Sequence, residues 1–384
     1  MTSLPAVRRR VCIVSTVPSA LTAFMAPHVR ALSAIADVTL VTTGGRAALG
    51  ALAASGVRCL DIEIRRDVAP WADLQSLVAL WRLFRREKFD VVHSITPKAG
   101  LLSMVAALLA GVPHRLHWFV GQVWATRTGV ARFLLRSLDI VLARAATGLL
   151  ADSRSQRAFL EQEGVVRPGE VAVLGDGSVC GVDTSRFKPD AEVRASTRRE
   201  LHLPDDALVV LYLGRLNPDK GIPELTRAFG AAAAEHPKLY LLAVGPDETS
   251  LRPWMVQTLG AAQTRLKFVD YTSSPERYMA AADIFMLPSH REGFGATVIE
   301  AAACEVPTIG TSIYGLTDAI VDGETGLLVP VGDVRRLTAA LNTLVGDRAL
   351  LGRLGATARR RVVDKFSEPR LTEALLALYR DLRP

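Results

Sequence analysis

Runs of β-forming residues alternate with helix-like segments along nearly the whole chain, and this alternation constrains the fold more than any other sequence feature. The strands expected in the first half are VCIVST, DVTLVTT, CLDIEI, DVVHSI, HRLHWFV, ATGLLAD and VAVLGDG. Those expected in the second half are ALVVLYLGRL, LYLLAVG, LKFVD, ADIFMLPS, PTIGTS and GLLVP. Strands that are separated by helices pair in parallel, with the helices on both faces of the sheet. The sequence therefore predicts a doubly wound α/β architecture.

The alternation is interrupted once, and the interruption divides the chain. Residues 173–190, VLGDGSVCGVDTSRFKPD, are rich in Gly, Ser and Asp and lack periodicity, which is typical of a linker. We expect one Rossmann-like domain over residues 1–182, joined by a C-terminal amphipathic helix over 370–384, and a second Rossmann-like domain over 183–369. Two such domains would face a central cleft at the carboxyl ends of their strands, where proteins of this architecture bind ligands.

Composition narrows the class of protein. The four cysteines are scattered along the chain, which predicts neither a disulfide framework nor a zinc site and favours a reducing, cytoplasmic setting. No apolar run reaches the ~18 residues of a membrane-spanning helix. The longest such run, residues 100–112, predicts a buried helix. The arginines at 8–10 and the apolar run after them look like a signal peptide, but the α/β pattern that follows predicts a buried first strand instead.

Basic residues are concentrated in the first half. Residues 1–189 carry 23 Lys and Arg against 14 Asp and Glu, whereas residues 190–384 carry 23 against 25. A basic half favours a polyanionic partner, either an anionic membrane surface or nucleic acid, although a merely solvated face has the same composition. The motifs and the aromatic spacing of RNA and DNA readers are missing, so nucleic acid is not expected as a partner.

The stretch PSHREGFGATVIEAAA, residues 288–303, places two acids around a glycine turn that leads from a strand into a helix. A helix N-terminus presents unpaired amides and partial positive charge, which attract anions. Gly293 and Gly295 leave the backbone open to a ligand. Glu292 lies on the loop and Glu300 about one turn into the helix, so their carboxylates flank the anion site. This frame suits a ligand with a central phosphate and a sugar at each end, such as a nucleotide sugar.

A second loop carries two cations. The segment GRLNPDKG, residues 214–221, follows the first strand expected in the second domain. Arg215 can bind phosphate oxygens with two parallel hydrogen bonds, and Lys220 supplies a compact charge. Between glycines at a strand end, the pair is typical of a diphosphate site, although a surface turn with two solvated charges is the alternative.

Six segments together carry a resemblance to a known family. GRLNPDKGIPEL, ADIFMLPSHREGFGATVIEA and GLTDAIVDGETGLLVPVGD cover the second half nearly from end to end. They resemble the retaining, family-4 type (group 1) glycosyltransferases of GT-B fold. In the first half, DVVHSITPKAGLL, HWFVGQVWATRTG and GDGSVCGVDTSRFKP resemble, less strictly, a bacterial branch that builds lipid-linked saccharides for surface polysaccharides or glycoproteins.

The resemblance implies roles for individual residues. Arg215 and Lys220 would hold the donor diphosphate, and Glu300 would accept hydrogen bonds from ribose hydroxyls. Glu292 and the amides of Phe294 and Gly295 would hold the transferred sugar. The expected catalytic residues are Glu292, Arg215 and Lys220. The expected donor-binding set is Gly214, Arg215, Lys220, Gly245, Glu292, Gly293, Phe294, Gly295, Thr297 and Glu300.

The expected chemistry is electrostatic. Breaking the anomeric C–O bond leaves negative charge on the departing nucleoside diphosphate, which two cations and a helix N-terminus would stabilise. No Asp-x-Asp motif stands out, so neither a metal nor any cofactor besides the nucleotide-sugar donor is expected. The usual account of the family is front-face attack, in which the leaving phosphate takes the acceptor's proton. Glu292 would then position the sugar and would not act as the nucleophile.

The acceptor side departs from the family pattern. Val120-Gly121 stands where many relatives have His-Gly, and His117, three residues earlier, faces the other side of its strand and is expected to be structural. Gln122 and Thr126 are polar substitutes. A second element, HSITPKAG, residues 93–100, ends a strand and opens a helix at which Lys98 would make another anion site. The expected acceptor-binding residues are His93, Thr96, Lys98, Gln122 and Arg127, with a purely structural His93 as the alternative.

We therefore expect a cytoplasmic, membrane-peripheral retaining glycosyltransferase. It would move a hexose or N-acetylhexosamine from a UDP-sugar to a saccharide carried on a polyprenyl diphosphate in surface-glycan assembly, with the basic first half and its apolar helix docked on anionic lipid. The alternatives are a transferase with a soluble acceptor, a nucleotide-sugar 2-epimerase of the same fold, and a non-catalytic nucleotide-sugar binder.

Overall fold

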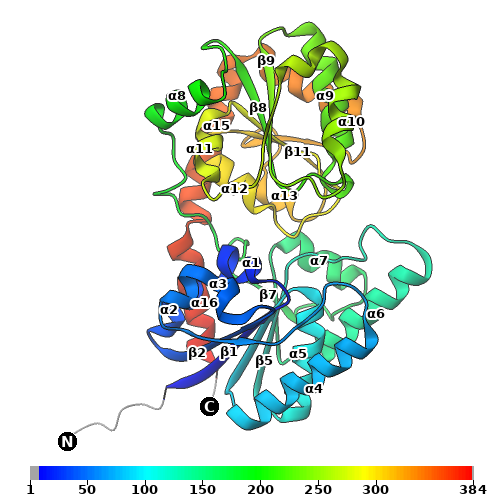
Figure 1. The fold of residues 1–384 in the computed structure, drawn as a ribbon, viewed down its shortest axis with the longest axis vertical. Coiled ribbons are helices and arrows are strands. Elements are labelled where there is room, and N and C mark those ends of the chain that lie inside the picture. Colours follow the sequence, from blue (N-terminus) through cyan, green and yellow to red (C-terminus); the bar gives the residue numbers. More distant parts are fainter. Residues whose placement is uncertain (1–7, 383–384) are drawn as a thin grey trace, which may run out of the picture. The chain divides into compact units, whose positions relative to one another are not determined.

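The computed structural model describes residues 8–382 and forms two compact units (Figure 1). Unit 1 comprises Met1–Cys180 together with Pro369–Pro384, and unit 2 comprises Gly181–Glu368. Each unit has a parallel sheet with helices on both of its faces. The predicted doubly wound α/β class is therefore confirmed, because every strand expected from the sequence is present.

Unit 1 is built on a seven-stranded sheet in the order β3-β2-β1-β4-β5-β6-β7. Its strands are β1 Arg9–Ser15, β2 Ala36–Thr42, β3 Arg58–Asp61, β4 Val91–Ile95, β5 His114–Phe119, β6 Gly148–Ala151 and β7 Val171–Val173. Its helices are α1 Pro18–Ala20, the π-helix η1 Leu21–Met25, α2 Ala26–Ser33, α3 Gly45–Ala54, α4 Pro70–Glu87, α5 Pro97–Ala110, α6 Gly129–Ala145, α7 Arg154–Gln162 and α16 Glu368–Asp381. The central strand β4 is buried along its whole length, including the polar side chains of His93 and Ser94.

The C-terminal helix α16 is part of the core of unit 1. Leu371, Leu375 and Tyr379 of α16 are buried in the same cluster as Val11 and Ile13 of β1. At its end, the helix accepts hydrogen bonds from the Arg9 side chain to the carbonyls of Tyr379 and Leu382. A segment from the far end of the sequence therefore completes the first sheet's covering layer.

The longest apolar run of the sequence forms α5, as predicted, and half of its residues are buried where the helix packs against α4 and α6. No helix among residues 8–382 is long and apolar enough to cross a membrane.

Unit 2 has a six-stranded sheet in the order β10-β9-β8-β11-β12-β13. The strands are β8 Leu208–Leu213, β9 Leu239–Val244, β10 Leu266–Val269, β11 Ile284–Leu287, β12 Thr308–Thr311 and β13 Gly326–Val329. The helices are α8 Ala191–Glu200, η2 Pro218–Lys220, α9 Ile222–Glu235, α10 Leu251–Leu259, η3 Gly260–Arg265, α11 Pro275–Ala281, α12 Ala296–Ala303, α13 Leu316–Ala319, α14 Val334–Gly346 and α15 Arg348–Lys365. Since β8 and β11 are neighbours, the loops that follow them meet at one edge of the sheet.

The chain enters and leaves unit 2 through two segments that lie side by side. Val182 and Ser367 form a parallel bridge, with the Val182 amide 2.8 Å from the Phe366 carbonyl oxygen. Gly181 has a φ of 66°, and a Cβ there would lie 2.5 Å from the same oxygen. Only glycine fits this close approach, which explains its place in the predicted linker.

Candidate active site

The site in unit 2 begins where β8 and β9 end. Gly214 follows β8 and Gly245 follows β9, and a Cβ on Gly245 would collide with the Gly214 carbonyl. The hydroxyl of buried Tyr212 donates to the Arg215 carbonyl oxygen at 2.7 Å. This contact fixes the backbone from which the Arg215 side chain extends.

The loop after β8 turns through the short helix η2. The Asn217 side chain accepts a hydrogen bond from the Lys220 amide at 3.2 Å and so caps this turn. Gly221 follows with a φ of 70°, and a Cβ at this position would overlap the Pro288 carbonyl. The two loops that the sequence analysis singled out are therefore in direct backbone contact.

Further bonds hold the loop after β11 in place. The His290 amide donates to the Asp219 carbonyl at 2.9 Å, and the Thr311 hydroxyl donates to the Ser289 carbonyl. The Arg291 guanidinium lies 3.7 Å from the Asp219 carboxylate. The loop is thus tied both to η2 and to the neighbouring strand β12.

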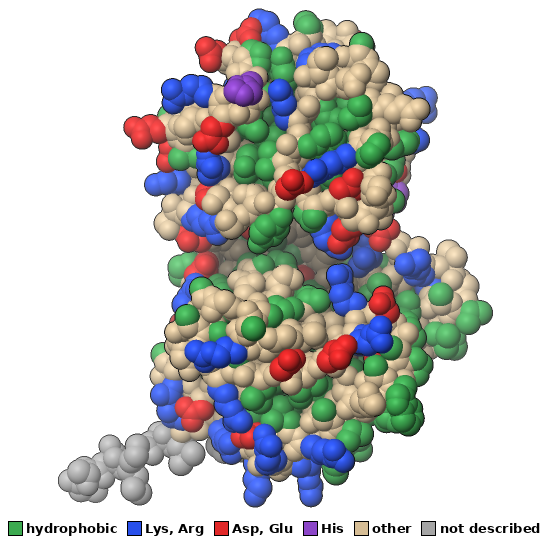
Figure 2. Space-filling view, viewed as in Figure 1, with side chains coloured by type: hydrophobic (Ala, Val, Ile, Leu, Met, Phe, Trp, Pro, Cys, Tyr) green, Lys and Arg blue, Asp and Glu red, His purple; other side chains and the backbone are tan. Residues whose placement is uncertain are grey.

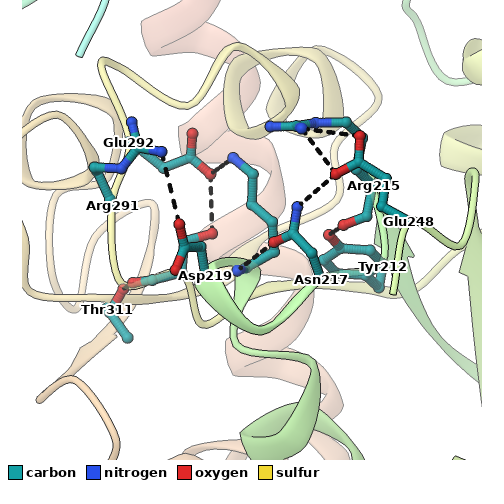
Figure 3. Close-up of polar contacts among 10 residues, drawn as sticks. Tyr212, Arg215, Asn217, Asp219, Glu248, Arg291, Glu292 and Thr311 are labelled. Atoms are coloured by element: carbon teal, nitrogen blue, oxygen red, sulfur yellow. Dashed lines mark hydrogen bonds and ion pairs between the residues drawn. The ribbon is translucent and has the colours of Figure 1, made fainter. Parts of the chain in front are cut away.

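The cations of the first loop each have a carboxylate partner (Figure 3). Lys220 Nζ lies 2.6 Å from Glu292 Oε1, and Ser289 Oγ donates to the same oxygen at 2.9 Å. Arg215 Nη1 lies 3.0 and 2.8 Å from the two carboxylate oxygens of Glu248. The Lys220 and Glu292 side chains are largely shielded from solvent, being only 19% and 13% exposed, whereas those of Arg215 and Glu248 are 44% and 35% exposed.

The glycine turn leads into α12 at Ala296, as predicted. Gly295 has a φ of 83°, and a Cβ there would lie 2.6 Å from Leu316 Cδ2. The Phe294 side chain is buried, with its ring centre 5.3 Å from that of Phe366. Phe294 therefore offers a ligand only its backbone, whereas Gly293 and Thr297 are partly exposed.

Glu300, on the first turns of α12, has a carboxyl group with a raised pKa. Burial raises the pKa of its carboxyl to about 7, although the nearby Arg186 guanidinium opposes this shift. The group consequently changes charge near neutral pH.

Sequence analysis did not name Glu248, Asn217 or Ser289 as residues of this site. Glu248 joins Arg215 to the Asn217 side chain, which donates to Glu248 at 3.0 Å, and Ser289 contacts Glu292. Glu248 follows β9, the strand beside β8, so its position at a neighbouring strand end is the signal that could have revealed it.

On unit 1, Thr96 and Lys98 come together at the start of α5. Thr96, with a φ of 76°, precedes Pro97, and its hydroxyl donates to Thr16 Oγ1 at 3.0 Å. Lys98 Nζ lies 2.7 Å from the Asp73 carboxylate. The charge at this helix start is therefore already balanced by an acid of α4.

His93 and Gln122 lie in the interior instead of at the surface. His93 is fully buried, with Nδ1 2.9 Å from the Tyr379 hydroxyl and its ring stacked on Trp118. Gln122 is buried and accepts a hydrogen bond from Gln156 at 3.3 Å. His93 is therefore buried and has a hydrogen-bond partner from α16, and its acceptor role stays a prediction beside the structural role that the sequence left open.

Two more residues of the acceptor side, His117 and Arg127, lie on β5 and on the loop that follows it. His117 is buried and contacts Ser94 at 2.9 Å, in keeping with a structural role. Arg127 is exposed on the loop that precedes α6. The same loop is anchored by Trp124, whose Nε1 donates to Asp139 of α6 at 2.7 Å.

Family models cover both units. Residues 193–361 match the model "Glycosyl transferases group 1", and residues 22–177 match "Glycosyl transferase 4-like domain". The capsular polysaccharide biosynthesis glycosyltransferase CapM of Staphylococcus aureus is 33% identical over 320 residues, which are 83% of each chain. The chain belongs to the group 1 glycosyltransferases. The predicted resemblance to the group 1 glycosyltransferases and the predicted enzyme class are thereby confirmed.

Two further comparisons place this glycosyltransferase among its relatives. The Escherichia coli UDP-Gal:alpha-D-GlcNAc-diphosphoundecaprenol alpha-1,3-galactosyltransferase is 26% identical over 329 residues, 83% of this chain and 82% of its own. Anabaena HepE, solved with UDP and glucose, matches 98% of this chain and 100% of its own with a TM-score of 0.83 and 17% identity. The fold of the two units is GT-B, as expected.

Proposed function

We propose that this glycosyltransferase transfers a hexose or N-acetylhexosamine from a UDP-sugar, with retention of configuration, to a saccharide carried on a polyprenyl diphosphate. The observation that carries the donor side is that Arg215, Lys220 and Glu292 lie on two loops in direct contact, the second of which leads into α12. Two cations and a helix N-terminus at one sheet edge suit a diphosphate. The acceptor side is supported by the Escherichia coli relative, whose name specifies a diphosphoundecaprenol-linked sugar.

In this proposal the ion pairs of the free protein hold the cations ready. The incoming diphosphate exchanges places with the carboxylates around Arg215 and Lys220, and the helix start adds its amides. As the anomeric bond breaks, these groups stabilise the negative charge that collects on the leaving diphosphate. Glu292, released from Lys220, accepts hydrogen bonds from hydroxyls of the transferred sugar and orients it.

The proposed donor contacts of Glu300 lie on the other side of the turn. Its carboxylate accepts hydrogen bonds from the ribose hydroxyls, and the backbones of Gly293, Phe294 and Gly295 approach the sugar. Gly214 and Gly245, whose backbones pack closely at the ends of β8 and β9, would lie under the diphosphate. The reaction proceeds without a metal ion.

The acceptor's diphosphate is proposed to bind at the start of α5, where Lys98 and Thr96 lie. Arg127 of the neighbouring loop would add a second positive charge. Such an acceptor requires the enzyme to work at the cytoplasmic face of the membrane.

A direct experiment is to offer the purified protein UDP-, GDP- and dTDP-sugars, each with a polyprenyl-diphosphate saccharide or with a soluble saccharide, in EDTA. We expect product from a UDP-sugar and the lipid-linked acceptor only. Product from the soluble saccharide alone would contradict the acceptor assignment, and loss of activity in EDTA would contradict metal independence. An epimerised nucleotide sugar, detected by NMR with donor alone, would make the protein a 2-epimerase.

A further inference from the structure

An apolar surface covers the outer side of one helical layer of unit 1. In most surface helices the outward face is polar, but α6 carries outward apolar side chains over its entire length. Val130 and Phe133 are 73% and 64% exposed. Figure 2 shows hydrophobic side chains gathered over the part of unit 1 where Figure 1 draws α4, α5 and α6.

The three helices form this surface together, because α5 packs against both α4 and α6. We call it the outer apolar face. Its exposed members are Trp71, Leu74 and Trp81 of α4, Leu108 and Leu109 of α5, and Val130, Phe133, Leu134, Leu138 and Val141 of α6. On α6 these residues recur every three or four positions, so they lie along one stripe of the helix. Exposed apolar surface of this extent marks an interaction site.

The charges around the outer apolar face are positive. Arg82 and Arg85 are exposed on α4 beside Trp81, and Arg144 is exposed near the end of α6. The acids of these three helices are already engaged. Asp73 pairs with Lys98, Glu87 pairs with Arg58, and Asp139 is buried under Trp124. Outside these helices, Glu170 lies close enough to Arg144 to interact with it electrostatically. The positive charges that border the outer apolar face are therefore chiefly those of Arg82 and Arg85 on α4.

We propose that the outer apolar face docks on an anionic lipid bilayer, with its leucines, valines and phenylalanine among the acyl chains and its arginines at the phosphates. Tryptophan and arginine at the border of an apolar face match the chemistry of the membrane interface. A second copy of the chain is a poorer match, since a two-fold contact would bring the same arginines against each other. This proposal rests on the proposed function, in which the acceptor is carried in a membrane.

Docking through α6 would also position the loop before this helix, residues 120–128, which carries predicted acceptor-binding residues. Asp139 lies on the inner side of α6 and accepts the hydrogen bond from Trp124 at 2.7 Å. The Trp124 ring stacks on Phe159 at 5.3 Å, and the Arg132 guanidinium lies 5.4 Å from its centre. The loop with Gln122 and Arg127 is thus fixed to the docking helix, which would hold it at a set distance from the lipid headgroups.

The test is flotation of the purified full chain with vesicles of phosphatidylcholine alone or mixed with phosphatidylglycerol. We expect the chain to float only with the anionic vesicles. F133S/L134S should lower the floated fraction at least tenfold. R82Q/R85Q should also lower the floated fraction at least tenfold when the assay is run at physiological salt. The controls are Y271S and R353Q, which change an exposed aromatic residue and an exposed arginine of unit 2 and should float like the wild type.

A second measurement needs no variant that changes α6. Brominated phosphatidylglycerol should quench the fluorescence of exposed Trp71 and Trp81, and W71F/W81F should abolish most of the quenching. The proposal would be overturned if the wild type showed neither flotation nor quenching. It would also be overturned if the wild type were a dimer that F133S/L134S converts to monomers, because the outer apolar face would then bind a second copy of the chain. Neither assay depends on catalysis, so a chain that floats but transfers no sugar would contradict only the proposed function.

Discussion

Lys220 and Glu292 form an ion pair with 2.6 Å between Nζ and Oε1, joining the loop after β8 to the loop after β11 (Figure 3). The proposal gives these two residues different ligand groups, the donor diphosphate and the transferred sugar. Donor binding must therefore separate or rearrange the pair, and this exchange leads to the first prediction.

Replacing Glu292 should separate binding from turnover. In Glu292→Ala the Lys220 amine loses its partner and stays available to the diphosphate, so nucleotide-sugar affinity should remain within about tenfold, or about 1.4 kcal/mol. Turnover should be almost lost, because the sugar is no longer oriented. Calorimetry and a transfer assay measure the two effects, with Glu324→Ala, an exposed acid of the same unit, as the control. Unchanged turnover would remove Glu292 from the mechanism.

Arg215 and Glu248 should have opposite effects on donor affinity. Arg215→Ala removes a charged hydrogen-bond donor worth about 1.5–3 kcal/mol, so UDP affinity should fall about 10- to 100-fold. Glu248→Gln frees the partly exposed guanidinium from a surface pair and should raise the affinity by no more than about fivefold. The exposed Arg335→Ala is the control for a general change of charge. If both variants bind UDP like the wild type, Arg215 does not contact the diphosphate.

Donor affinity should depend on pH through Glu300. Because the pKa of its carboxyl in the free protein is about 7, the group is neutral below this pH and ionised above it. Ribose hydroxyls donate more strongly to a carboxylate than to a neutral acid. Affinity for a UDP-sugar, whose diphosphate diester does not titrate in this range, should therefore rise from pH 6 to pH 8. Glu300→Gln should bind more weakly at pH 8 and give a flat profile, and an equal slope in both proteins would refute the assignment.

The contact between the two site loops should be sensitive to a single methyl group. Gly221→Ala combines a positive φ with a clash against the Pro288 carbonyl and should lower the free energy of unfolding by about 2–4 kcal/mol. Gly352→Ala, in open space within α15, should instead stabilise by up to about 1 kcal/mol. Chemical denaturation monitored by circular dichroism measures both, and an unaffected Gly221→Ala would mean that the loops do not touch in solution.

Lys98 should matter for the acceptor and not for the donor. Lys98→Ala removes the cation at the start of α5, so KM for a diphosphate-linked acceptor should rise at least tenfold while KM for the donor stays within about twofold. Lys238→Ala, an exposed lysine of unit 2, is the control. Equal changes in both KM values would count against the acceptor assignment.

The positions of strands and helices were readable from the sequence because they depend on local patterns. The buried run around β4 and the turn at Gly295 before α12 are examples. The pairing of Lys220 with Glu292 was not readable, since it depends on two loops that meet only when β8 and β11 become neighbours. For the same reason the burial of His93 was open, because its partner Tyr379 comes from the other end of the chain.

The sequence also did not show which apolar side chains of α6 face solvent. The apolar residues of α6 read equally well as core, and only packing shows that Leu142 faces inward while Phe133 faces solvent. Residues that are apolar on both faces of a helix give no period that separates the two.

The most direct test of the central claim is a crystal structure of the protein with a bound nucleotide sugar. We predict the diphosphate within hydrogen-bond distance of the Arg215 guanidinium, Lys220 Nζ and the first amides of α12, with the Lys220–Glu292 pair opened. A diphosphate bound elsewhere, with that pair intact, would contradict the account.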